Sequence, residues 1–299
     1  MRCLVFCDAL HDIYLNILVR YARPELELIK AYYFGDEFAS AAGIQLFPLS
    51  TIVDKESFDT AIILFSETDV LRQLISKVYG VDFQCTVVDL NSFAKECLTG
   101  AGQLELLRLD IEYKCPSNYN FVCGDFSYYV SLDIKDDIKD GSVKVRVGKF
   151  CSIGPGVSFL LGVEHRSDWG TSYPFNRLLG REANAQSSVA SKGDIVIGND
   201  VWIGANATVL SGVNIGDGCV VGSNTVVSKS VEPYSIIVGN PGRVVKERFL
   251  PNHIDMLMEM KWWDWDYQKI FDALDIIQSN DVEALYLYWK RSKNEDSVS

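Results

Sequence analysis

The sequence lacks a long apolar segment. Hydrophobic residues make up 48% of its 299 positions, yet no apolar run reaches the length that a transmembrane helix needs. The first residues, MRCLVFCDALHD, reach acidic side chains too early for a secretory signal peptide and contain no small-residue cleavage pattern. We therefore expect no membrane insertion and a cytoplasmic protein.

Paired cysteine motifs are also missing. The eight cysteines form no CxxC pair, and several, such as Cys3 and Cys219, lie inside apolar runs. Thiols in such surroundings are usually buried and free in an intracellular protein. Without a CxxC pair, a zinc site or a redox motif is not expected.

Positive charge is in deficit. Lysine and arginine number 28 against 40 aspartates and glutamates, which gives a formal net charge of −12. This balance argues against nucleic acid and anionic membranes as partners. An anionic cofactor would therefore need a local cluster of cations.

The stretch from Ile195 to Gly242 has a six-residue period. Helices repeat near 3.6 residues and strands every two, so neither produces this spacing. A period of six predicts a parallel β-solenoid, in which each hexad forms a short strand with its aliphatic residue buried. Glycine follows four of the aliphatic residues and is expected to help the chain turn a corner. The aliphatic positions are Ile197, Ile203, Val209, Ile215, Val221 and Val227.

The same period extends upstream with one interruption. Cys123 and Val147 are 24 residues apart, which is four hexads, and Ile153 continues the pattern. The interval to the next repeat is not a multiple of six, so an inserted loop is predicted near 160–194. Long loops inside compact domains tend to be functional. The acidic segment Asp133–Asp140 is predicted to be a solvated loop.

The rest of the chain differs from the solenoid in its periodicity. Residues 1–100 alternate strand and helix patterns, which predicts an α/β domain with a small parallel sheet. Residues 101–120 are predicted to be a linker and 121–242 the solenoid. Helical spacing predicts C-terminal helices over 243–299, beginning with a helix at Val244–Arg248.

Three segments carry a family resemblance. The run from Ile197, IGNDVWIGANATVLSGVNIGDGCVVGSNTVVSKSVEPYSIIVGNPGRVVKERF, is joined by GVEHRSDWGTSYPF at 162–175 and KWWDWD at 261–266. Together they resemble the acyl-CoA-dependent hexapeptide-repeat acyltransferases, closest to the xenobiotic (chloramphenicol and streptogramin) acetyltransferase branch. The resemblance covers roughly Tyr119 to Leu274. It implies a left-handed parallel β-helix with three hexads per coil.

The N-terminal region has a weaker resemblance, to the Rossmann-like domain of some bacterial sugar acyltransferases of the hexapeptide class. In those proteins a glycine-rich first turn meets a nucleotide-sugar. Here the first turn, Phe6–His11, contains no glycine, and a backbone cradle for phosphate needs glycine for close approach. An interaction or acceptor-positioning domain is the alternative.

The resemblance implies a catalytic histidine. His165 falls at the position of the family's catalytic histidine, and the chain contains only three histidines. Direct attack by an acceptor hydroxyl or amine on a thioester needs one base with a pKa near neutrality, which imidazole provides. Asp168, Trp169 and Tyr173 would line the acceptor pocket, or would only order the loop.

The resemblance also implies acetyl-CoA as the acyl donor. The groove for its pantetheine arm would comprise Trp202, Ala205, Ser223, Ser228 and Lys229. Its phosphates would meet a cluster of cations, because charge-assisted contacts to phosphate are strong. The cations implied are Lys229, Arg243 and Lys246. The alternative is that these cations only begin the C-terminal helix.

The predicted function is transfer of an acetyl group to a hydroxyl or amine of a sugar or nucleotide-sugar. Antibiotic acetylation of the chloramphenicol or streptogramin type is the alternative, and a non-catalytic β-helix scaffold is a third possibility. A metalloenzyme on the same solenoid would need about three converging histidines, but His11 and His253 lie outside the repeats. No metal is expected. The family implies a homotrimer with the CoA groove between adjacent solenoids.

Overall fold

A computed structural model describes residues 98–137, 141–180 and 187–296, and, of the first 97 residues, Arg20 and the backbone of six strands. The chain divides into two compact units. One comprises Met1–Leu107 with Asp266–Asp272, and the other comprises Arg108–Trp265 with Ala273–Ser299. The domain boundaries drawn from the sequence stay a prediction.

The first unit contains a six-stranded sheet in the order β3-β4-β2-β1-β5-β6. All its pairings are parallel except β3 with β4. The helices predicted between its strands lie outside the described residues, as does the first turn, so the Rossmann-like assignment stays a prediction. The strands are β1 (Arg2–Cys7), β2 (Glu27–Tyr33), β3 (Ala39–Ala41), β4 (Ile44–Pro48), β5 (Thr60–Ile63) and β6 (Thr86–Val88).

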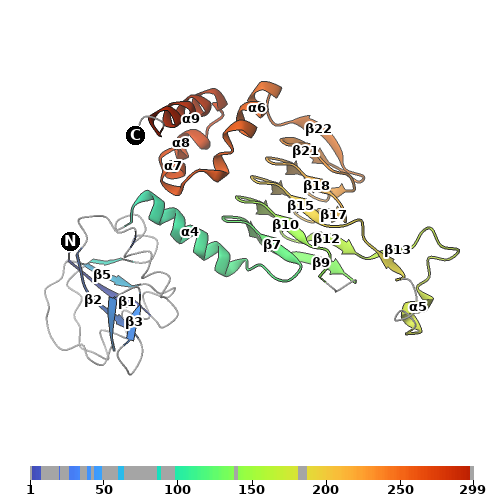
Figure 1. The fold of residues 1–299 in the computed structure, drawn as a ribbon, viewed down its shortest axis with the longest axis horizontal. Coiled ribbons are helices and arrows are strands. Elements are labelled where there is room, and N and C mark those ends of the chain that lie inside the picture. The colour runs from blue at the N-terminus through green and yellow to red at the C-terminus, as the bar shows by residue number, and fades with distance from the viewer. Residues whose placement is uncertain are drawn as a thin grey trace. The chain divides into compact units, whose positions relative to one another are not determined.

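The second unit is a parallel β-solenoid with three walls. Figure 1 shows its strands stacked as rungs. The first wall contains β7 (Phe121–Cys123), β10 (Val145–Val147), β15 (Ile195–Ile197) and β18 (Asn214–Ile215). The second contains β8 (Tyr128–Tyr129), β11 (Ser152–Ile153), β16 (Trp202–Ile203), β19 (Val220–Val221), β21 (Ser235–Val238) and β22 (Arg243–Glu247). The third contains β9 (Leu132–Asp136), β12 (Val157–Gly162), β17 (Thr208–Leu210) and β20 (Val226–Val227).

The strand register confirms three hexads per coil. Trp202 pairs with Val220 and Thr208 with Val226, so the partners are 18 residues apart. The aliphatic residue of each hexad points inward, and these residues form one continuous core. Ile203 and Val209, for example, are fully buried. Burial of apolar area drives folding. The six-residue pattern therefore reflects which residues form this core.

Two residues shape each corner that contains a hexad glycine: that glycine and the residue two positions after it. The hexad glycines allow close stacking, because a Cβ added at Gly204 would lie 2.6 Å from the Ser223 backbone nitrogen. The left-handed backbone conformation falls two positions later, for example at Asn206 (φ 58°) and Asn224 (φ 59°). Asparagine tolerates this conformation better than most residues. Close approach, rather than the turn itself, therefore requires these glycines.

Two segments differ from their predictions. The acidic stretch predicted as a loop begins with strand β9, in which Ile134 packs against the core. Residues Val244–Arg248, predicted as a helix, instead belong largely to strand β22, which pairs antiparallel with β21. Without β22, strand β21 at the end of the second wall would have unpaired backbone groups on its outer edge. Because β22 pairs with these groups, a strand is favoured over the predicted helix.

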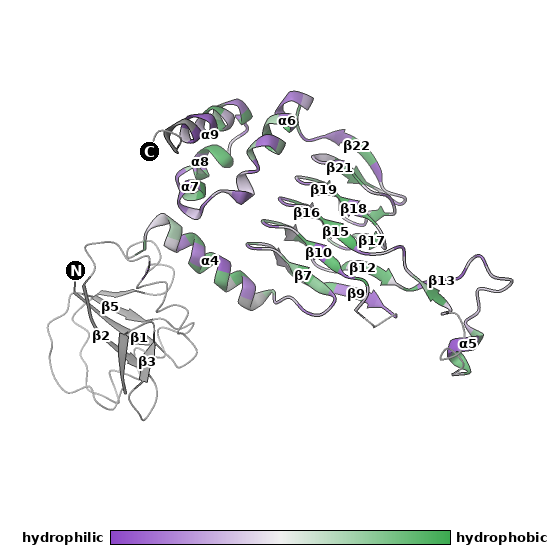
Figure 2. Cartoon of the chain, viewed as in Figure 1, coloured by the Kyte–Doolittle hydropathy of each residue, from purple (hydrophilic) through white to green (hydrophobic). Residues whose placement is uncertain are grey.

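Helices precede and follow the solenoid strands along the chain. Figure 2 shows hydrophobic and hydrophilic residues alternating along α4. In the C-terminal tail, Trp289 packs with Tyr234, which belongs to the last solenoid coil, in one buried cluster. The helices are α4 (Gly100–Lys114), α6 (Pro251–Met260), the 3-10 helix η3 (Trp262–Asp264), α7 (Tyr267–Asp272), α8 (Leu274–Ile277) and α9 (Val282–Asp296).

Candidate active site

His165 lies on a short ribbon inserted between β12 and β15. Strand β13 (Glu164–His165) pairs antiparallel with β14 (Val189–Ala190), and His165 lies opposite Val189. In Figure 1, β13 and α5 (Phe175–Leu178) project from the stacked strands. We call residues 163–194 the His165 segment. It is here that the six-residue period is interrupted.

The His165 ring is exposed, and one backbone contact orients it. Its Nδ1 lies 2.8 Å from the backbone oxygen of Ser172, in the same segment. A carbonyl oxygen only accepts hydrogen bonds, so Nδ1 carries the proton in this contact. The neutral ring then presents the lone pair of Nε2. This is the tautomer that a general base at Nε2 requires.

The neighbours of His165 form a second small cluster. Arg166 Nε donates to Asp168 Oδ1 at 2.7 Å, and a second nitrogen of the guanidinium donates to Oδ2. This pairing lowers the pKa of the Asp168 carboxyl. The Arg166 guanidinium also lies 5.4 Å from the centre of the Trp169 ring. Asp168 therefore orders Arg166 and Trp169 in the segment, whether or not it also meets an acceptor.

Three of the predicted groove residues lie on the second wall. Trp202 is exposed on β16, and the strand register continues from it through Val220 and Ile236 to Lys246 on β22. Arg243 lies at the other end of β22, opposite Val238. The structure thus places Trp202 and Lys246 in one outward-facing row.

The other four predicted groove residues lie at corners. Ala205 and Ser223 occupy the same corner in successive coils, where the Asn224 nitrogen donates to the Ala205 oxygen at 2.9 Å. Ser228 and Lys229 follow β20 at the next corner and are exposed. His165 belongs to a segment that leaves the solenoid after β12, which is in the same wall as β20. Within one chain, the predicted groove residues are therefore spread over two corners and one wall, and His165 lies in the segment outside them.

Sequence reasoning missed the contacts that join the His165 segment to the solenoid. Glu164 Oε1 accepts a hydrogen bond from Ser211 Oγ at 3.0 Å, and Glu164 Oε2 lies 3.4 Å from Lys192 Nζ. Glu164 and Ser211 are far apart in the sequence and belong to no shared motif. No signal in the sequence pairs these residues.

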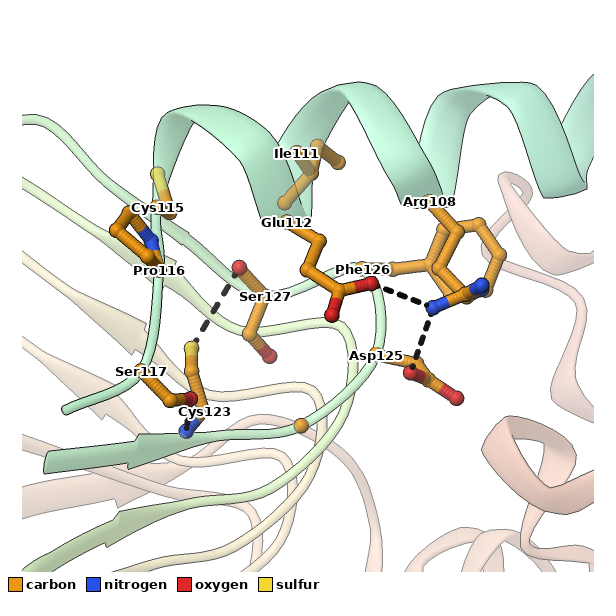
Figure 3. A pocket seen from close by; sticks show the side chains of 11 residues that line it. Arg108, Ile111, Glu112, Cys115, Pro116, Ser117, Cys123, Asp125, Phe126 and Ser127 are labelled. Atoms are coloured by element: carbon orange, nitrogen blue, oxygen red, sulfur yellow. Dashed lines mark hydrogen bonds and ion pairs between the residues drawn. The ribbon is translucent and has the colours of Figure 1, made fainter. Parts of the chain in front are cut away.

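A cavity of about 280 Å³ lies elsewhere, between α4 and the first coil. In Figure 3, Arg108 points toward Glu112 and Asp125. Its guanidinium lies 2.9 Å from Glu112 Oε2 and 3.6 Å from Asp125 Oδ1. The charges at this cavity therefore pair with one another. None of the residues predicted for the site lines it.

Two structural features of the described residues bear on alternative functions. Within the described part of the chain, no group of three or more histidine, cysteine, aspartate or glutamate residues is placed to hold a metal ion. No helix among those residues is both long and apolar enough to cross a membrane.

Comparisons with known proteins identify relatives. The family described as "Bacterial transferase hexapeptide (six repeats)" matches residues 194–229. A chloramphenicol acetyltransferase of Agrobacterium fabrum is 36% identical over 197 residues, which cover 62% of this chain and 93% of the relative. A virginiamycin A acetyltransferase of Staphylococcus aureus is 39% identical over 180 residues, covering 56% of this chain and 82% of the relative. A Vibrio cholerae hexapeptide-repeat acetyltransferase, solved with acetyl coenzyme A, is 25% identical with a TM-score of 0.34, covering 54% and 84% of the two chains.

These findings define the class of protein. The solenoid and the match to the hexapeptide family make the chain a hexapeptide-repeat acyltransferase. Within that class it belongs to the xenobiotic acetyltransferase family, together with the chloramphenicol and virginiamycin A acetyltransferases. The family and the enzyme class predicted from the sequence are thereby confirmed.

Proposed function

We propose that this enzyme transfers the acetyl group of acetyl-CoA to a hydroxyl group of an antibiotic-type acceptor. The similarity to chloramphenicol and virginiamycin A acetyltransferases supports this class of acceptor. The observation that carries the proposal is the oriented ring of His165, with Nδ1 on the Ser172 carbonyl. The sugar or nucleotide-sugar acceptor predicted from the sequence has less support, because both of these relatives are named for antibiotics.

The chemistry needs a base and no protein nucleophile. His165 Nε2 takes the proton of the acceptor hydroxyl as its oxygen attacks the thioester carbon. The carbon–sulfur bond then breaks, and the imidazolium returns the proton to the leaving sulfur. The products are the acetyl ester and free CoA thiol. Burial raises the pKa values of the Cys123 and Cys151 thiols to about 12, so neither supplies a thiolate for a covalent step.

The donor would bind along the outer surface of the solenoid. Trp202, Ala205, Ser223 and Ser228 would contact the pantetheine arm. The CoA phosphates would meet cations that are exposed and make no ion pair with any residue the structure describes. On a chain of net charge −12, exposed cations that make no ion pair with the described residues suit an anionic ligand. Those cations are Lys229, Arg243 and Lys246.

Assembly would complete the site. A homotrimer of left-handed β-helices would bring His165 of one subunit to the groove residues of its neighbour, with Asp168, Trp169 and Tyr173 facing the acceptor. The exposure of Trp202, with 57% of its surface accessible, suits a residue that a neighbouring subunit covers. A cytoplasmic enzyme with an N-terminal α/β domain of separate role fits this proposal. Light scattering tests the assembly, and a monomer that still transfers acetyl groups would overturn it.

The decisive variant is His165→Ala. Loss of a general base lowers kcat by about 10²–10⁴-fold, measured as thiol release from acetyl-CoA. His253 provides a matched control, because it lies on the tail helix α6 with its Nε2 3.3 Å from Glu283. We expect His253→Ala to leave kcat unchanged. Unchanged acetylation by His165→Ala would refute the proposed role.

An acceptor screen tests the substrate class. Chloramphenicol, virginiamycin A and an aminosugar are offered separately to the purified enzyme with acetyl-CoA, and product masses are recorded. We expect acetyl esters of an antibiotic and little product from the aminosugar. A higher kcat/KM for the aminosugar would restore the sugar acceptor predicted from the sequence.

A further inference from the structure

We propose that Glu164 and Ser211 are positioning residues for His165. Together with Lys192 they form a set of contacts that we call the segment clasp. The clasp joins both ends of the His165 segment to one corner of the solenoid. This inference rests on the proposed role of His165 as the base.

Ser211 is the centre of the clasp. It follows β17 and is only 3% exposed. Its Oγ donates to Glu164 Oε1 at 3.0 Å and accepts from the Lys192 backbone nitrogen at 3.0 Å. Both hydrogen-bonding functions of this buried hydroxyl are therefore used, which fixes its rotamer.

The same corner holds the far end of the segment by its backbone. The Gly212 nitrogen donates to the Gly193 oxygen at 3.0 Å. Gly212 has φ +72°, and a Cβ added there would lie 2.8 Å from the Lys192 backbone oxygen. The segment therefore enters at Glu164 and returns at Lys192 against two adjacent residues of the solenoid wall.

The clasp reaches the base through the backbone. Successive side chains of a strand point to opposite faces, so Glu164 faces the solenoid while His165 faces away. Glu164 is half-buried and His165 is exposed, as this arrangement requires. The ribbon itself pairs only two residues of β13 with two of β14, so it gives little rigidity of its own. The fixed carboxylate of Glu164 therefore sets the position of the adjacent ring.

A purely structural role for the clasp makes a different prediction. In that case, removing it would lower stability and leave the turnover of the folded enzyme unchanged. Ser127 offers a matched comparison. It is a corner serine, 2% exposed, whose Oγ donates to the Gly148 oxygen at 2.6 Å and accepts from the Cys151 nitrogen at 2.8 Å. Ser127 bonds within the solenoid and does not contact the His165 segment.

The experiment compares Ser211→Ala, Glu164→Ala, Glu164→Gln and Ser127→Ala in the full chain. For each variant, kcat and KM for acetyl-CoA are measured by thiol release, and Tm is measured by thermal unfolding. A small displacement of a catalytic group costs up to about 10²-fold in rate, so Ser211→Ala and Glu164→Ala should lower kcat by about tenfold or more with KM unchanged. Ser127→Ala should lower Tm and leave kcat unchanged. Glu164→Gln keeps a carbonyl oxygen for Ser211 and should restore most of kcat.

The outcomes separate this inference from the proposed function. If Ser211→Ala and Glu164→Ala lower kcat no more than Ser127→Ala does, the positioning role is wrong, even where His165→Ala is inactive. If His165→Ala stays active, the proposed function fails first. Should Ser211→Ala not fold, the two Glu164 variants decide, because Glu164 is not part of the buried core. Equal loss in Glu164→Ala and Glu164→Gln would also overturn the inference.

Discussion

The solenoid and the His165 segment treat apolar side chains in opposite ways. In the solenoid, inward residues such as Phe159 and Val209 are fully buried. In the segment, Tyr173 and Phe175 pack edge to face with ring centres 4.7 Å apart, yet each is 55% exposed. Helix α5 has no buried residue. The repeating part of the chain therefore builds a core, while the part that breaks the repeat depends on a few anchoring contacts.

Because of this difference, we expect the wall and the segment to tolerate substitutions to different extents. A fully stacked coil tolerates little change, since close-packed interiors respond to single methylene groups. A segment with exposed aromatic residues loses little stability when its side chains change. If the segment faces the acceptor as proposed, substitutions there should change specificity without loss of the fold.

The largest expected effect is the difference in stability loss between Phe159→Ala and Phe175→Ala. Replacing a buried phenylalanine by alanine costs about 3–5 kcal/mol in the free energy of unfolding, and Phe159 is fully buried in the third wall. Phe175→Ala removes a ring that is already half-solvated, so its cost should fall within about 0.5 kcal/mol. Urea denaturation of both variants measures the difference. Similar losses in the two variants would contradict the contrast between wall and segment.

The second effect concerns thiol reactivity. Burial raises the pKa of Cys151 to about 12 and that of Cys219 to about 11, from an ordinary value of 9.0. Because only the thiolate reacts, a shift of three units lowers the alkylation rate by about a thousandfold. Ser167 is exposed in the His165 segment, so Ser167→Cys supplies a matched thiol that should react at the normal rate.

The thiol comparison is made with iodoacetamide and peptide mass spectrometry of the Ser167→Cys variant. Residue 167 should be labelled in the native protein, while Cys151 and Cys219 should be labelled only in denaturant. Equal native labelling of Cys151 and residue 167 would show that the solenoid opens far more readily than its packing indicates.

The solenoid could be predicted from the sequence because its core residues recur at a regular interval along the chain. The hexads of aliphatic residues are the residues that the structure buries. Strand β22 escaped prediction because the five residues Val244–Arg248 are too few to show a clear period, and the exposed end of the second wall makes a strand preferable there. Strand β9 escaped because its exposed positions, Asp133 and Lys135, are charged, while only Leu132 and Ile134 supply apolar contacts to the core.

The candidate site was predictable only in part. Resemblance supplied His165, since a single histidine in a loop has no pattern of its own. The Ser172 carbonyl that sets its tautomer is a backbone group, which no side-chain pattern reveals. The contact of Glu164 with Ser211 joins residues 47 apart through the fold. Contacts of this kind depend on strand register and corner geometry, so a one-dimensional pattern does not predict them.

The smallest expected effect is on the pH dependence of stability, which should have opposite signs for two aspartates. Burial raises the pKa of Asp200 in the solenoid above its ordinary value of 3.8. The charge of Arg248, whose Nη1 lies 3.0 Å from Asp200 Oδ2, opposes this shift. The native state then keeps a proton that the unfolded chain has lost, so this residue's contribution to stability falls as pH rises from 3.8 toward the native pKa. In the His165 segment, the hydrogen bond from Arg166 lowers the pKa of Asp168, and its contribution is instead lost as pH falls. Denaturant unfolding should give difference curves, relative to the parent protein, of opposite slope: for Asp200→Asn as pH rises above 3.8, and for Asp168→Asn as pH falls below 3.8. Curves of the same slope would show that the Arg248 pair outweighs burial at Asp200, and that wall and segment treat their carboxylates alike.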